Sequence, residues 1–194
     1  MTRRRLTLAL ITLLPSAGFA ASSVEEAQRI LRAAIDEVLV LADKAPDLAV
    51  LEDRIAPVLL KHISFDAMTR RAIGPGWRQF NDPQQKKAVA LFSKLVIHSY
   101  SSKFTIGEHP QVKFHSAASP ASGRVEVTTT TLYRGERFAV IYRMEEAEKW
   151  RTTDVVIEGV SLVANYRSQL DPVFKKGGAE AVIRSLEQSV AKSR

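Results

Sequence analysis

The fold is decided by residues 124–145, which read Arg124-Val-Glu-Val-Thr-Thr-Thr-Thr-Leu-Tyr-Arg-Gly-Glu-Arg-Phe-Ala-Val-Ile-Tyr-Arg-Met-Glu145. Apolar or β-branched side chains alternate with polar ones over much of this stretch, and a period of two is typical of strands with one buried face. Gly135 lies near its centre, where a tight hairpin turn needs a residue that tolerates positive φ. The stretch therefore predicts two adjacent antiparallel strands, at residues 124–133 and 138–145.

Similar alternation flanks this hairpin at residues 112–116 and 149–158, and the joints contain Pro120 and Gly123. Apolar residues before and after the strands recur at helical spacing. We therefore predict an α+β fold in which a curved four-stranded antiparallel sheet packs against several helices. An apolar cavity between the layers and a completely filled core both agree with this pattern. The residues expected to share one face of the last strand are Trp150, Thr152, Asp154 and Val156.

Capping residues predict where the helices begin and end. Ser23 starts a capping-box pattern before a run of apolar residues that continues to Leu41. Asp82, followed by proline, predicts an N-cap for the longest helix of the middle segment. Ser161 predicts the start of another helix, and Gly177-Gly178 separates it from the last one.

The first 20 residues predict a secretory signal peptide. Three arginines at positions 3–5 precede a short apolar run and Gly18-Phe19-Ala20, which has the pattern of a small-x-small cleavage site. A retained N-terminal anchor and a twin-arginine export signal are the alternatives. Cleavage after Ala20 leaves a single predicted domain, residues 21–194.

Composition excludes several classes of protein. The chain has 194 residues, no cysteine, and 28 Lys+Arg against 21 Asp+Glu. Without cysteine it can form no disulfide, zinc–thiolate site or cysteine nucleophile. Loss of the three N-terminal arginines lowers the net charge from +7 to +4. No basic run is interleaved with aromatic residues, so we expect no binding to nucleic acid.

Motifs of catalysis and metal binding are weak. There is no Gly-x-Ser-x-Gly sequence and no Walker loop. Asp154 and Glu158 could provide acid–base chemistry, or they could accept hydrogen bonds at the end of a strand, with Arg143 or Arg167 as partner. We predict no catalytic residue, no metal and no cofactor. The histidines, none of which has the spacing of metal ligands, are His62, His98, His109 and His115.

A family signature follows the predicted hairpin. The segment reads Trp150-Arg-Thr-Thr-Asp-Val-Val-Ile-Glu-Gly-Val-Ser-Leu-Val-Ala-Asn-Tyr-Arg167. Its Asp-x-x-x-Glu-Gly-Val-Ser core closely resembles that of the toluene-tolerance family, which consists of periplasmic phospholipid-binding proteins. Thr153 departs from the family pattern, which commonly has an aromatic residue at this point.

Other segments extend the resemblance over residues 24–186. They are Phe65-x-x-Met68-x-x-Arg71-x-x-Gly74 with Trp77-Arg78, Leu91-Phe92-x-x-Leu95 with Tyr100, and Lys175-Lys176-Gly177-Gly178 with Val182, Ile183 and Leu186. The resemblance implies a periplasmic phospholipid carrier, the soluble shuttle of the Mla lipid-asymmetry system. Such a carrier is no enzyme and moves lipid between an outer-membrane lipoprotein complex and an inner-membrane ABC transporter complex. A monomer is the simplest form of such a shuttle.

The implied function requires a deep and dry apolar site. Two chains of about 16 carbons hold about 30 methylenes, and each exposed methylene costs about 0.8 kcal/mol in water. Periodicity selects eight residues to line the chains: Phe92, Leu95, Val96 and Tyr100 from the long helix, and Val127, Val140, Tyr142 and Val156 from the sheet. A register error of one residue would exchange the two faces of a strand.

The lipid phosphate is expected near the mouth of this site. Arg143 and Tyr166 are the candidates there, because a guanidinium can bind two phosphate oxygens. A structural ion pair with Asp154 is an equal alternative for Arg143. Four residues are expected to build the strand-to-helix corner: Asp154, Glu158, Gly159 and Ser161.

Three other functions stay open from the sequence. The cargo could be a hopanoid or another apolar lipid. A cavity enzyme would depend on Asp154, His98 or Tyr142. An interaction module would have a filled core and an exposed apolar patch for a partner.

Overall fold

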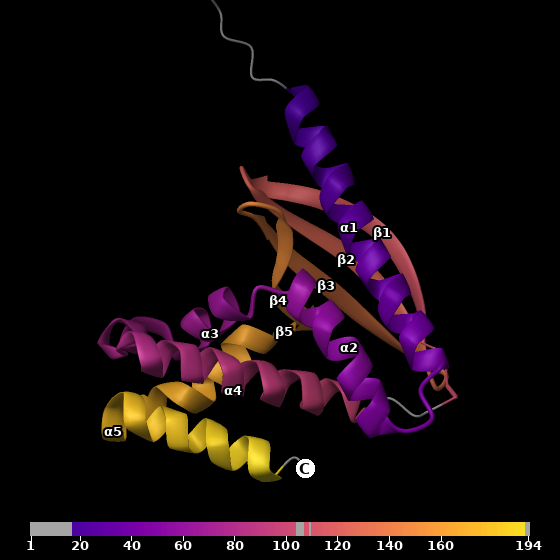
Figure 1. Ribbon diagram of the computed structural model, residues 1–194. Helices are drawn as coiled ribbons and strands as arrows, with labels where there is room; N and C mark the ends of the chain where they lie inside the picture. The colour runs from indigo at the N-terminus through magenta and orange to yellow at the C-terminus, as the bar shows by residue number, and fades with distance from the viewer. Residues whose placement is uncertain (1–16, 104–106, 109, 193–194) are drawn as a thin grey trace, which may run out of the picture.

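A computed structural model describes residues 17–103, 107–108 and 110–192 (Figure 1). The chain begins with helices, continues with strands and ends with a long helix, which confirms the predicted α+β class. The elements are α1 (Ala17–Asp43), α2 (Leu48–His62), α3 (Phe65–Ile73), the 3₁₀ helix η1 (Gly74–Gln79), α4 (Asp82–Ser101), β1 (Gln111–Ala121), β2 (Arg124–Tyr133), β3 (Glu136–Glu146), β4 (Trp150–Ile157), β5 (Val160–Ser161) and α5 (Leu162–Lys192).

Only part of the predicted signal peptide lies within the described residues. Residues 1–16 of the predicted signal peptide lie outside the described part of the chain. Helix α1 begins at Ala17, so Ser23 lies within the helix and the predicted start at this serine was wrong. Cleavage after Ala20 stays a prediction.

The sheet has five antiparallel strands in the order β1-β2-β3-β4-β5, so the prediction of four strands was one too few. The additional strand is short. After β4 the chain turns through Glu158 and Gly159, which have φ angles of 50° and 79°. Val160 and Ser161 then pair back onto Ile157 and Val156. A two-residue strand leaves no stretch of alternation that the sequence could reveal.

The two faces of the sheet differ in chemistry. We call one the apolar face, which carries Val125, Val127, Thr129, Val140, Tyr142 and Met144, and the other the charged face, which carries Arg124, Glu126, Arg143, Glu145 and Asp154. Strand β4 changes face at a bulge, because Met144 pairs with Thr152 whereas Arg143 pairs with Asp154. Thr153 is the extra residue. The predicted common face of Trp150, Thr152, Asp154 and Val156 was therefore wrong.

Helix boundaries agree closely with the capping rules. Helix α4 is capped one residue earlier than predicted, because Asn81 and Gln84 form a reciprocal capping box. The Ser161 hydroxyl accepts a hydrogen bond from the backbone N–H of Ala164 at 3.0 Å, as expected for the start of α5. Non-helical angles at Gly177 and Gly178 divide α5 into two helices, as predicted.

Two large hydrophobic clusters form the core. The helical cluster joins α3, α4 and α5 and includes Phe65, Phe92 and Leu186. The sheet cluster joins α1 to the apolar face and includes Ala27, Leu31 and Trp150. A smaller cluster joins α1 to α2. In Figure 1, α1 runs along the sheet, whereas α3, α4 and α5 gather beyond one end of it.

Candidate functional site

The apolar face is covered over only part of its length. Val125, Val127 and Met144 are buried beneath α1, where they pack with Ala27 and Leu31. Farther along the same face, side chains remain partly exposed. We call this part the half-open region; it consists of Phe138, Tyr142, Val155 and Ile157. Cross-strand pairing brings Tyr142 beside Val155 and Val140 beside Ile157.

Helix α1 meets the apolar face through small and aliphatic side chains. Ala27 and Leu31 are buried there, and Val24, Ile30 and Ile35 are partly buried. At the edge, the Arg32 guanidinium lies 3.9 Å from the centroid of the Phe114 ring of β1. This cation–π contact adds an interaction between α1 and the outermost long strand, of about 0.5–1 kcal/mol at such an exposed site. The helix opposite the apolar face is therefore α1.

Polar groups on the apolar face are sparsely paired. The Thr129 hydroxyl donates to the backbone oxygen of Val140 at 3.2 Å. Within the described residues, the Trp150 indole Nε1 is buried without a hydrogen-bond partner. Burial raises the pKa of the Tyr142 phenol to about 12, so this group stays neutral at physiological pH. These three side chains present neutral polar atoms to a ligand.

The residues predicted to line a lipid fall into two separate places. Phe92, Leu95 and Val96 are buried in the helical cluster, and Tyr100 packs against it. Val127, Val140 and Tyr142 share the apolar face. Val156 lies on the opposite face, because the bulge at Thr153 changes the register. Three of the eight predicted residues therefore share the apolar face, and only Tyr142 of these belongs to the half-open region, because Val127 and Val140 are buried.

Tyr166 also belongs to the helical cluster. Its ring meets Phe92 edge-on, with 5.0 Å between the centroids. Burial raises the pKa values of both Tyr100 and Tyr166, and a hydrogen bond with Ser99 opposes the change at Tyr166. These contacts hold Tyr166 against α4.

Arg143 makes the structural ion pair that was one of its two predicted roles. It lies on the charged face and contacts Asp154 at 3.2 Å and Glu126 at 2.9 Å. Hydrogen bonding to Glu126 raises the pKa of Arg143 further above its usual value. Its side chain is half exposed, so these contacts contribute little to stability.

Asp154 joins β4 to the start of α5. One carboxylate oxygen accepts from the backbone N–H of Val163 at 3.1 Å, and the other accepts from the Ser161 hydroxyl at 2.6 Å. Glu158 accepts a hydrogen bond from the backbone N–H of Ala139. Both carboxylates are thus hydrogen-bond acceptors at the corner, where Gly159 supplies a positive φ. Arg167 lies elsewhere, against Gly74.

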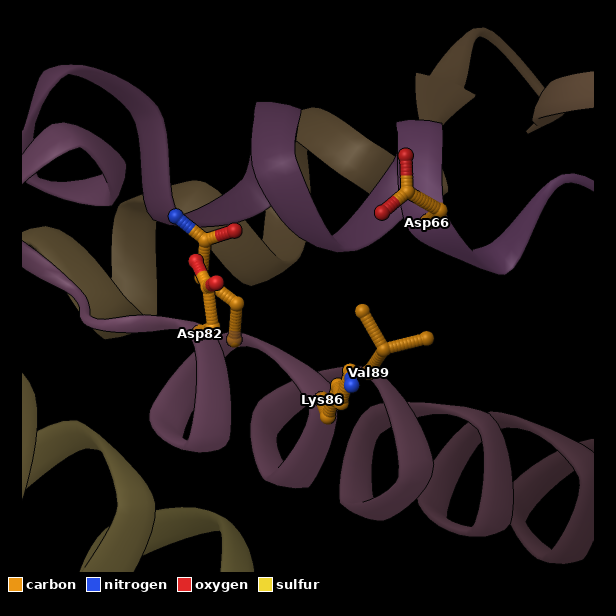
Figure 2. A pocket seen from close by; sticks show the side chains of 5 residues that line it. Asp66, Asp82, Lys86 and Val89 are labelled. Atoms are coloured by element: carbon orange, nitrogen blue, oxygen red, sulfur yellow. The ribbon is translucent and has the colours of Figure 1, made fainter.

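A hollow between α3 and α4 is less suited to an apolar ligand. Its volume is about 430 Å³, and Figure 2 shows that the labelled side chains come from these two helices. Four of its five lining residues carry a carboxylate, amide or ammonium group; the full lining is Asp66, Asp82, Gln85, Lys86 and Val89. Its chemistry does not match that of an acyl chain.

Sequence reasoning missed the contribution of α1 and of the β4 register. Ala27 and Leu31 had the helical periodicity of core residues, but periodicity does not say which layer a helix contacts. Val155 and Ile157 were missed because the bulge moves them onto the apolar face. Among the described residues, no helix has the length and apolar content needed to cross a membrane.

Comparisons with known proteins agree with this arrangement. The family model described as MlaC protein matches residues 32–188. A solved structure of a phospholipid-binding protein from Ralstonia solanacearum, in complex with a phospholipid, superposes with a TM-score of 0.80. The two are 25% identical, and the match covers 87% of this chain and 98% of the other. No curated protein matches the chain.

Proposed function

Because this chain belongs to the MlaC family, we propose that it is a phospholipid carrier whose acyl chains lie along the half-open region of the apolar face. The match to a protein solved with a bound phospholipid supports this proposal. The observation that carries it is the half-open region itself. Four aliphatic or aromatic side chains of β3 and β4 remain partly exposed on a face that α1 covers at Val125, Val127 and Met144.

Binding energy would come from removing the acyl chains from water. Each methylene that leaves water contributes about 0.8 kcal/mol, so eight methylenes contribute about 6 kcal/mol. The neutral phenol of Tyr142 and the indole of Trp150 add no charge that an acyl chain would have to desolvate. Chains laid on this face need no bond to be made or broken, and release needs only a competing apolar surface.

The carrier would work in the periplasm. The predicted signal peptide provides for export, and the resemblance of residues 150–167 to a periplasmic family supports the location. We propose that the carrier exchanges phospholipid with an outer-membrane lipoprotein complex and an inner-membrane ABC transporter complex. The mild net charge of +4 that remains after cleavage is compatible with brief contacts with either.

Native mass spectrometry of the mature protein, purified from a periplasm without detergent, tests the proposal. We expect an added mass in the phospholipid range that is released on denaturation and identified by organic extraction. A bound hopanoid would retain the carrier function but replace the cargo. If the protein carries no lipid, and also fails to take phospholipid from vesicles, the proposed function is wrong.

A further inference from the structure

A second hollow lies on the charged face, where the sheet meets α3 and α5. Its volume is about 430 Å³. Three arginines from three different elements line it: Arg71 of α3, Arg124 of β2 and Arg143 of β3. We call this hollow the arginine pocket; its remaining lining is Pro120, Val125, Glu126, Met144, Glu145, Thr153, Asp154 and Val163. It lies across the sheet from the half-open region.

Positive charge is unevenly compensated within the arginine pocket. Arg143 contacts two carboxylates, Glu126 and Asp154. At the other end of the pocket two arginines share one carboxylate, because Glu145 contacts both Arg71, at 2.6 Å, and Arg124, at 3.4 Å. The sheet register also places Arg151 opposite Glu145.

The geometry of the two arginines suits an oxyanion. Arg71 approaches Glu145 from a helix, and Arg124 approaches it from the neighbouring strand, so each guanidinium group contacts a different oxygen of one carboxylate. Both side chains are partly exposed, with relative exposures of 36% and 62%. A guanidinium group has five N–H donors, and one carboxylate cannot accept them all from two arginines. Donors therefore remain for a second anion.

We propose that the arginine pocket binds the phosphate group of a phosphate ester, held between Arg71 and Arg124. Planar guanidinium groups bind phosphate oxygens in pairs, and two groups from different elements match the tetrahedral arrangement of these oxygens. The volume exceeds that of a phosphate alone and leaves space for the glycerol of a phosphoglyceride or of a free glycerol phosphate. Glu145 competes with the phosphate for the same donors.

Because Glu145 competes with the phosphate, replacing Arg124 and replacing Glu145 should change the affinity for phosphate in opposite directions. The full mature protein is titrated calorimetrically with inorganic phosphate and with glycerol 3-phosphate at an ionic strength of about 0.1 M, where the Debye length is about 10 Å. Arg124→Gln is expected to weaken binding about tenfold, because it removes one of the two clamping groups. Glu145→Gln is expected to tighten binding about tenfold, because it frees both arginines. A merely structural role for Glu145 would not produce this gain.

Matched controls lie at the far end of β3, the strand that carries Glu145. Glu136→Gln changes the net charge of the protein by the same amount as Glu145→Gln, and Arg137→Gln by the same amount as Arg124→Gln. Both control side chains are exposed. We expect each control to change affinity less than about twofold, since charges beyond a Debye length are screened. Thermal unfolding of every variant shows whether the fold is retained. If Glu145→Gln and Glu136→Gln have equal effects, the proposal is overturned.

A second arm distinguishes the two sources of phosphate. Vesicles of phosphatidylglycerol are sedimented with the wild-type protein and with Arg124→Gln. If glycerol phosphate binds saturably and Arg124→Gln weakens this binding, a small ester is sufficient as the ligand. If Arg124→Gln weakens only the binding to vesicles, the ligand is a lipid headgroup. If neither probe depends on Arg124, the site does not exist. Lipid occupancy in native mass spectra is measured separately, so this result leaves the carrier proposal unaffected.

Discussion

The helical cluster and the apolar face of the sheet are built from similar side chains, but they are closed to different degrees. In the helical cluster, helices surround Phe92 completely, with an exposure of 0%. On the sheet, α1 covers Val127 equally well, but Val155 and Ile157 on the same face remain partly exposed. A closed cluster contributes stability alone, whereas a partly covered face can also accept a ligand.

Truncation of a buried aromatic residue should expose this difference most strongly. Phe92→Ala removes a ring that contacts Tyr166 and leaves a cavity between helices, so we expect a loss of about 3–5 kcal/mol in the free energy of unfolding. Val155→Ala in the half-open region should cost about 1 kcal/mol or less, because its side chain is already partly in water. Urea denaturation of lipid-free protein measures both. Equal losses would contradict the comparison.

Enlarging side chains tests the two parts of the apolar face against each other. Val127→Trp should destabilise the protein by about 1–3 kcal/mol, because the site beneath α1 has no room. Val155→Trp should have a smaller effect on unfolding but should lower phospholipid occupancy in native mass spectra. Val160→Trp, at a position that is 61% exposed, is the control and should change neither quantity. Full occupancy in Val155→Trp would place the lipid elsewhere.

The sequence was informative wherever local chemistry decides the structure. The hairpin at residues 124–145, the hydroxyl cap at Ser161 and the break at Gly177-Gly178 each follow from residues next to one another. Long-range packing was not predictable in this way. The bulge at Thr153 depends on how β4 meets β3, and it moved Val156 to the charged face. The match of α1 to the apolar face likewise depends on contacts between distant segments.

Titration of Tyr142 should have no effect at neutral pH and should lower stability only in alkaline solution. Burial raises its pKa from 10.0 to about 12, so the folded protein retains a proton that the unfolded chain loses near pH 10. The unfolded state then binds fewer protons, and stability must fall as pH rises from about 10 to 12. Tyr142→Phe removes this contribution, so its unfolding midpoint in urea should fall less over this interval. An identical fall in both proteins would show that Tyr142 is not shielded.

A tryptophan in each of the two compared regions tests the central claim directly. Trp150→Phe leaves Trp77, which packs against the helical cluster, as the one tryptophan of the chain. The triple variant Phe138→Trp, Trp77→Phe, Trp150→Phe has its one tryptophan in the half-open region instead. Both variants are loaded with a phospholipid whose acyl chains carry bromine, a contact quencher of fluorescence. Acyl chains on the half-open region should quench the tryptophan introduced by Phe138→Trp strongly and leave Trp77 bright. Stronger quenching of Trp77, or no quenching in the fully loaded Phe138→Trp protein, would contradict the proposed site.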